Sequence, residues 1–136
     1  MTETLLDKAF QNLAVATNTY NTMCHDEVYL KYVGYHLQQA VELSLKYLLE
    51  ENGIEYIKTH DITQLLFSIK DAKLNVEIPE YIKEHADMFT IWESKTRYIT
   101  NYRLEKEKVG RAINEVTYFV ELLLGEPIDP KVKKPR

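Results

Sequence analysis

Arginines and lysines alternate with tyrosines between residues 95 and 111, and these side chains are the ones in the chain best suited to bind phosphate. The basic residues are Lys95, Arg97, Arg103, Lys106, Lys108 and Arg111, and the tyrosines are Tyr98 and Tyr102. A guanidinium binds phosphate through paired hydrogen bonds, and a tyrosine ring can stack on a base. The segment predicts a nucleotide- or RNA-binding site formed by Lys95, Arg97, Tyr98, Asn101 and Arg103. The alternative is a surface loop whose tyrosines pack on the protein and whose arginines pair with acidic residues.

A second polar group recurs at steps of three and four residues: His36, Gln39, Glu42 and Lys46. This spacing places the four side chains along one side of a helix. Glu42 and Lys46 form an acid-to-base pair in the favourable order, which by itself is worth a few tenths of a kcal/mol. The ion pair alone does not account for His36 and Gln39 on the same flank, so a polar network is expected there.

The third group is Thr59-His60-Asp61, at the start of an expected helix. A single histidine at such a place is usually a cap or a packing residue. The four histidines, His25, His36, His60 and His85, show no metal-ligand spacing, and Cys24 is the one cysteine. We therefore expect no zinc site, no other metal site and no cofactor.

Composition indicates one helical domain. The chain has 136 residues, of which 45% are hydrophobic and 28% charged, with only four glycines and four prolines, so little turn chemistry is available for a sheet of many strands. No apolar run approaches the roughly 20 residues that cross a bilayer, and the first residues lack a signal-peptide pattern. A lone cysteine suits a reducing compartment. A cytoplasmic protein without membrane contact is expected.

Charge is distributed unevenly along the sequence. The net charge is −4, yet residues 1–94 carry 15 acidic and 7 basic residues, whereas residues 95–136 carry 6 acidic and 10 basic ones. Such polarity can mark an anion-binding face on an acidic body. It can equally reflect a solvated helix face followed by a basic tail, and charge alone favours that second interpretation.

Apolar residues recur at spacings of three and four in five segments, which predicts an up-and-down antiparallel bundle of about five helices within residues 1–125. The expected helices run from Thr2 or Thr4 to Met23, from Tyr29 to Leu49, from Thr59 or Asp61 to Ala72, from Pro79 to Trp92, and from Glu105 to Gly125. The second helix is central, with a buried stripe of Leu30, Val33, Leu37, Val41, Leu45 and Leu48. Residues 93–104 show no clear period and are expected to be irregular. Three prolines predict an extended basic tail over residues 126–136.

Together the three polar groups resemble the prokaryotic HEPN family, whose name stands for higher eukaryotes and prokaryotes nucleotide-binding. The matching segments are residues 35–49, which read YHLQQAVELSLKYLL, residues 59–62, which read THDI, and Arg97-Tyr98. The resemblance implies a helical bundle, commonly a homodimer and often encoded beside a minimal nucleotidyltransferase. It also makes His36, Gln39, Glu42, Lys46, His60 and Asp61 a polar network of the family motif.

Many members of that family are metal-independent ribonucleases, frequently toxins restrained by the partner protein. Their signature is an arginine followed, after four to six residues, by a histidine near the dimer interface. Arg97 matches the arginine, but Tyr102, Arg103 and Leu104 stand where the histidine belongs. Tyrosine titrates near 10, so Tyr102 is a poor base at neutral pH, whereas histidine is well placed for that role.

The sequence therefore favours a HEPN-like protein that binds a nucleotide, RNA or a nucleotidyltransferase and belongs to a toxin–antitoxin pair, with a degenerate ribonuclease motif and no enzymatic activity. Two alternatives remain. One is an active metal-independent ribonuclease that uses Arg97 and Tyr102, with His60 as a further candidate base. The other is a helical interaction module without a ligand, in which the polar flank of the second helix only fixes the packing register.

Overall fold

The computed structural model describes residues 2–128, and every regular element in that range is a helix. The elements are α1 (Leu5–Met23), the short 3-10 helix η1 (Glu27–Tyr29), α2 (Leu30–Glu51), α3 (Ile62–Asp71), α4 (Glu80–Glu84), α5 (Ala86–Tyr98) and α6 (Lys106–Leu124). The all-helical prediction is confirmed. Within the described range, no helix combines the length and the apolar character that a membrane crossing requires.

Local sequence signals set several helix ends. Thr4 begins α1 with a capping box, in which its hydroxyl accepts from the Asp7 amide at 3.0 Å and the Asp7 carboxylate accepts from the Thr4 amide at 2.9 Å. Asp61 caps α3 by accepting from the Thr63 amide at 2.9 Å. Gly53 follows α2 and Gly125 follows α6, both with positive φ, which glycine adopts without strain.

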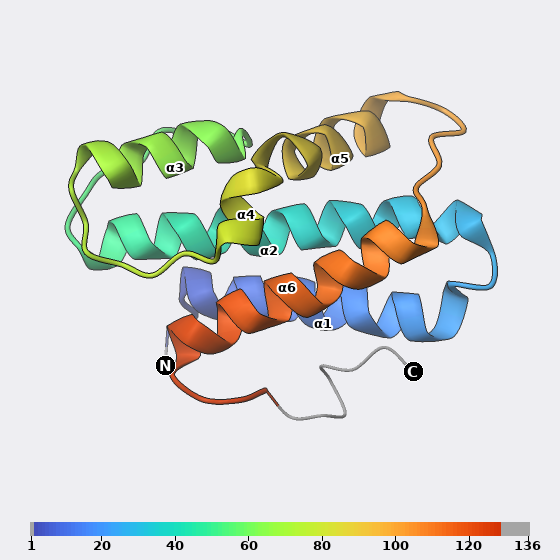
Figure 1. Ribbon diagram of the computed structural model, residues 1–136, viewed down its shortest axis with the longest axis horizontal. Helices are drawn as coiled ribbons and strands as arrows, with labels where there is room; N and C mark the ends of the chain where they lie inside the picture. Colours follow the sequence, from blue (N-terminus) through green and yellow to red (C-terminus); the bar gives the residue numbers. More distant parts are fainter. Residues whose placement is uncertain (1, 129–136) are drawn as a thin grey trace.

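The long helix α2 lies at the centre of the bundle (Figure 1). It contacts α1 and α6 on one side and α3 and α5 on the other, so most of its length is covered. All six residues of its predicted apolar stripe are buried, as expected: Leu30, Val33, Leu37, Val41, Leu45 and Leu48. Burial of this stripe by helices on both sides contributes to the hydrophobic stabilisation of the fold.

The helices α1 and α6 approach closely although they are far apart in sequence. The Tyr20 hydroxyl of α1 donates to the Lys106 carbonyl at 3.4 Å. A Cβ atom added at Gly110 would lie 2.7 Å from the Tyr20 hydroxyl oxygen, so any other residue there would force the Tyr20 side chain to shift. The last helix is therefore held directly against the first.

The fourth predicted helix differs from the structure at both ends. It is divided at His85, where φ is −110° and ψ is 19°, into α4 and α5. The helix α5 then continues to Tyr98, so residues 93–98 are helical and the prediction of an irregular segment over residues 93–104 is wrong for that half. The helix persists without an apolar period because Arg97 pairs with Glu93 one turn earlier, and because the Thr96 hydroxyl donates to the Lys31 carbonyl at 3.1 Å.

The division of the chain into a bundle over residues 1–125 and a tail over residues 126–136 stays a prediction. Ile128 is buried, and its amide donates to the Glu121 carboxylate at 2.9 Å. The rest of the predicted tail, from residue 129 onwards, lies outside the described residues.

Candidate functional site

A buried carboxylate organises the polar flank of α2. The side chain of Glu42 is 4% exposed, and Oε2 accepts from the Lys46 ammonium at 2.9 Å. Its other oxygen, Oε1, accepts from the Gln38 amide at 3.0 Å and from His60 Nδ1 at 2.8 Å. Each oxygen of a charge that is costly to bury thus has a donor. Glu42 is the centre of the predicted network.

Gln38 completes this network, although sequence reasoning gave it no role. It is fully buried, and its amide group also donates to the His60 carbonyl at 2.9 Å. Gln39 joins from the side by donating to the Gln38 side-chain oxygen at 2.7 Å. These bonds tie the segment between α2 and α3 to the middle of α2. The spacing of four residues between Gln38 and Glu42 is visible in the sequence, but the bond to a backbone carbonyl leaves no signal there.

Two of the predicted network residues lie elsewhere. His36 faces α1, where Nδ1 donates to the Asn12 side-chain oxygen at 2.8 Å. Burial lowers the pKa of His36, so this histidine stays neutral at pH 7. Asp61 is directed to the first turn of α3 as its cap and does not contact Glu42. The structure therefore brings together Gln39, Glu42, Lys46 and His60 of the six predicted residues.

Arg97 lies in the last turn of α5 and is fixed by two neighbours. Its Nε donates to Glu93 Oε2 at 2.5 Å and its Nη2 donates to Oε1 at 3.4 Å. The guanidinium carbon lies 4.7 Å from the centre of the Tyr98 ring. Glu93 is buried and Arg97 is exposed, so Glu93 holds one edge of the guanidinium while the remaining N–H groups have no partner among the described residues. An arginine held in this way is preorganised to bind an anion.

The residues beyond Arg97 form the corner between α5 and α6. Tyr98 is 73% exposed, and Asn101 adopts a positive φ of 65°, which asparagine tolerates better than most residues. Lys95 and Arg103 are exposed, and the Lys95 ammonium lies 5.9 Å from the centre of the Tyr102 ring. Burial raises the pKa of Tyr102, which keeps its hydroxyl protonated at neutral pH.

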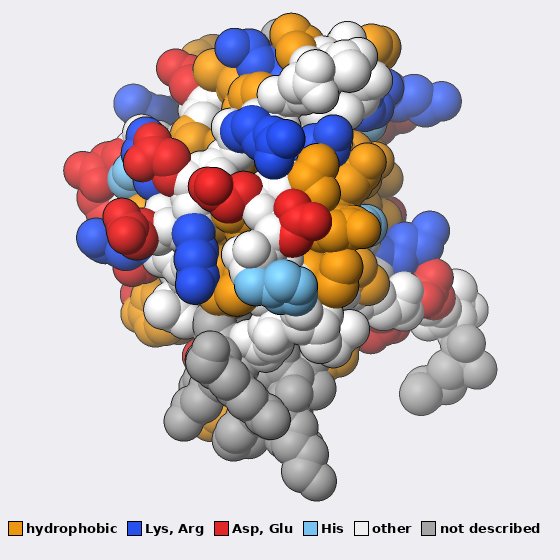
Figure 2. Space-filling model, turned by 90° about the vertical axis from the view of Figure 1, so that its right-hand side faces the viewer, with side chains coloured by type: hydrophobic (Ala, Val, Ile, Leu, Met, Phe, Trp, Pro, Cys, Tyr) orange, Lys and Arg blue, Asp and Glu red, His pale blue; other side chains and the backbone are white. Residues whose placement is uncertain are grey.

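Figure 2 views the end of the bundle where α5 ends and α6 begins. Lys and Arg side chains gather towards the top of this face, with hydrophobic side chains beside them and Asp and Glu side chains below. Acidic groups therefore border the basic ones closely. Among the described residues, no group of three or more His, Cys, Asp or Glu side chains is placed to hold a metal ion.

The family model of the HEPN domain matches residues 2–126, which is almost the whole chain. The chain belongs to the HEPN family. No curated protein and no solved structure matches it significantly. The resemblance drawn from the motif residues is thereby confirmed, and the helical bundle agrees with it.

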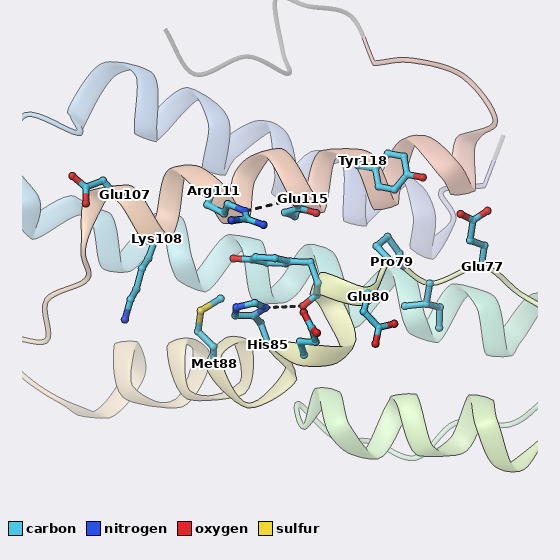
Figure 3. A pocket seen from close by; sticks show the side chains of 13 residues that line it. Glu77, Pro79, Glu80, His85, Met88, Glu107, Lys108, Arg111, Glu115 and Tyr118 are labelled. Atoms are coloured by element: carbon cyan, nitrogen blue, oxygen red, sulfur yellow. Dashed lines mark hydrogen bonds and ion pairs between the residues drawn. The ribbon is translucent and has the colours of Figure 1, made fainter.

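A groove of this HEPN domain lies between α4 and α6, and Arg97 does not line it. It has a volume of about 1030 Å³, and its lining includes Tyr81. His85 and Arg111 also line it (Figure 3). Of these three residues, the sequence analysis gave only Arg111 a possible binding role, as a member of the basic group. Tyr81 and His85 were missed because a single tyrosine and a single histidine in a short amphipathic stretch carry no motif.

Proposed function

We propose that this HEPN protein binds RNA or a nucleotide in the cytoplasm through the α5–α6 corner, without cleaving it. The observation that carries the proposal is the arrangement of Arg97, which is held by Glu93 and stacked on the exposed ring of Tyr98. A fixed guanidinium supplies a phosphate contact, and the neighbouring ring supplies a stacking surface for a base. Lys95 and Arg103 add positive charge on either side.

The absence of a suitable base favours binding over cleavage. Cleavage at a 2′-hydroxyl requires a group that accepts a proton near neutral pH. At the position where the family signature has histidine, this chain has Tyr102, whose pKa is raised by burial above its ordinary value of 10.0. His60 is 52% exposed, but its Nδ1 is bonded to Glu42 and it lies on the segment before α3, away from the α5–α6 corner. We therefore expect RNA to remain intact during incubation with the purified protein in EDTA.

Removal of the Arg97 guanidinium should weaken RNA binding by about tenfold, since a hydrogen bond to a charged group is worth about 1.5–3 kcal/mol and tenfold corresponds to about 1.4 kcal/mol. Fluorescence anisotropy with a labelled single-stranded RNA measures this change. Arg97→Ala alone would leave Glu93 buried without a partner, so the informative comparison is Glu93→Gln against Glu93→Gln/Arg97→Gln. Lys70→Ala, on the exposed face of α3, is the control and should bind RNA as the wild type does. Absence of saturable binding, or equal binding by the two Glu93→Gln variants, would contradict the proposal.

We also propose that the chain is a homodimer that contacts its copy through α5. Ile91 is exposed on α5, and Ile99 is exposed directly after the end of that helix. Large exposed apolar side chains on one surface are typical of an interface. In the family the nuclease arginine lies near the dimer interface, so this placement would put both Arg97 residues close together.

Light scattering coupled to size-exclusion chromatography tests the dimer. The wild-type protein should elute with twice the chain mass, and Ile91→Asp should elute as a monomer because a carboxylate would be buried in the contact. Phe67→Asp, which introduces the same charge at an exposed position of α3, should remain a dimer. A monomeric wild type, or a dimer that survives Ile91→Asp, would place the contact elsewhere or remove it.

The family resemblance extends the proposal to a partner, a minimal nucleotidyltransferase in a toxin–antitoxin pair. Co-purification with the product of an adjacent nucleotidyltransferase gene would support that extension, and failure to form a complex with it would count against it.

A further inference from the structure

We propose that the groove between α4 and α6 binds an arginine side chain on a basic segment of a partner protein. The groove is open along one side (Figure 3), and its lining on α6 begins at Glu107, in the first turn of that helix. Its walls come from the segment before α4, from α4 and the start of α5, and from one face of α6. None of the residues of the RNA site proposed above lines it.

The charge of the groove selects a cationic ligand. Five of the described residues that line it are glutamates, against one lysine and one arginine: Glu77, Glu80, Glu84, Glu107 and Glu115 against Lys108 and Arg111. Glu77, Glu84 and Glu107 have no ion-pair partner among the described residues, and the Lys83–Glu80 pair is long, at 4.0 Å. An excess of carboxylates repels phosphate and attracts a basic segment by electrostatic complementarity.

The centre of the groove has the form that a guanidinium requires. The His85 ring stacks on one face of the Tyr81 ring, with 3.9 Å between the ring centres. His85 is locked in this position because Nδ1 donates to the Tyr81 carbonyl at 2.9 Å. Only the opposite face of Tyr81 is left for a ligand, and a cation over that face gains a favourable cation–π interaction. Glutamates on both walls can then pair with the edges of the guanidinium.

Arg111 lies over that face of Tyr81 in the structure, which shows that a guanidinium fits there. The guanidinium carbon of Arg111 lies 5.4 Å from the centre of the Tyr81 ring, and its Nε lies 3.6 Å from a Glu115 carboxylate oxygen. The side chain of Arg111 is 69% exposed, so this ion pair is weak and is displaced at little cost. Arg111 thus occupies the position of the ligand arginine and competes with it. A partner arginine would take its place on Tyr81 and release Arg111 to solvent.

Because Arg111 competes with the ligand, its removal should strengthen the binding of an arginine peptide. The probes are two short blocked peptides, one with two arginines separated by glycine and the other with lysines in their place, titrated at low ionic strength into ¹⁵N-labelled protein. We expect amide shifts confined to residues 77–88 and to the Arg111 face of α6, with weaker binding of the lysine peptide. Arg111→Ala should tighten binding of the arginine peptide by about threefold, whereas a phosphate site would lose affinity.

Tyr81→Leu should weaken peptide binding by about threefold. The matched control is Tyr98→Leu, which removes a tyrosine lying under a different arginine, at 4.7 Å, and should leave peptide binding unchanged. Because Tyr81 also contacts Phe89, Glu84→Gln serves as a second weakening variant that does not disturb the core. The proposal is overturned if Arg111→Ala weakens binding or leaves it unchanged, if arginine and lysine peptides bind equally, or if shifts spread over the whole acidic surface.

Discussion

Replacement of Glu42 by alanine is expected to lower the free energy of unfolding by about 3 kcal/mol, the scale seen when one partner of a buried ion pair is removed. The variant leaves the Lys46 ammonium, whose side chain is only 11% exposed, without its carboxylate. It also removes the acceptor of the buried Gln38 amide and of His60 Nδ1. Urea unfolding monitored by circular dichroism measures the loss.

Glu50→Ala is the matched control for this prediction, because Glu50 lies on the same helix but is exposed. It should change the free energy of unfolding by no more than about 0.5 kcal/mol. Glu42→Gln keeps one acceptor oxygen, so its loss in free energy of unfolding should lie between those of Glu42→Ala and Glu50→Ala. RNA binding by folded Glu42→Ala should match that of the wild type, since Glu42 does not contact Arg97. Equal stability of the two alanine variants would show that the network contributes nothing to folding.

Phe89→Ala is expected to have the largest effect on stability, a loss of about 4 kcal/mol, because a buried phenylalanine leaves a cavity as well as lost apolar contact. Phe89 is fully buried in α5, and its ring packs edge-on against Trp92 at 5.5 Å and against Tyr81 at 6.3 Å between ring centres. It therefore connects the core to the ring that forms the floor of the α4–α6 groove. Thermal and chemical unfolding should both show the change.

Phe67→Ala is the control, since Phe67 lies on α3 and is 66% exposed. It should alter the free energy of unfolding by less than about 0.5 kcal/mol. A similar loss in both variants would mean that Phe67 is covered in solution, for example by a second copy. A small loss in Phe89→Ala would mean that the core around α5 closes over the space.

Helix positions followed closely from the sequence where an apolar period and a cap coincided. The first helix begins at Thr4, one of the two predicted starts, and the stripe of α2 and the glycine after α6 are as predicted. The end of α5 was missed because its stability comes from the Glu93–Arg97 pair and from Thr96 bonded to a carbonyl of α2. The spacing of four residues between Glu93 and Arg97 was visible in the sequence and could have predicted both the helix and the ion pair.

The candidate sites were less accessible to sequence reasoning than the fold. Glu42 and His60 could be connected because they belong to one motif, but no pattern indicated that His36 would turn to α1 instead. The α4–α6 groove could not be predicted from the sequence either. Tyr81 and Arg111 are brought together by the packing of α4 on α6, and contacts between distant segments leave no local spacing to detect.

The direct packing of α6 against α1 has a consequence for how the chain is made. A ribosome releases α1 and α2 first, and these neighbouring helices can pair early because their contacts are local in sequence. The surface that they present to α6 stays uncovered until the last helix emerges, because α6 packs on both α1 and α2. During translation the nascent bundle therefore exposes an apolar face for most of its synthesis, the condition in which chaperones bind.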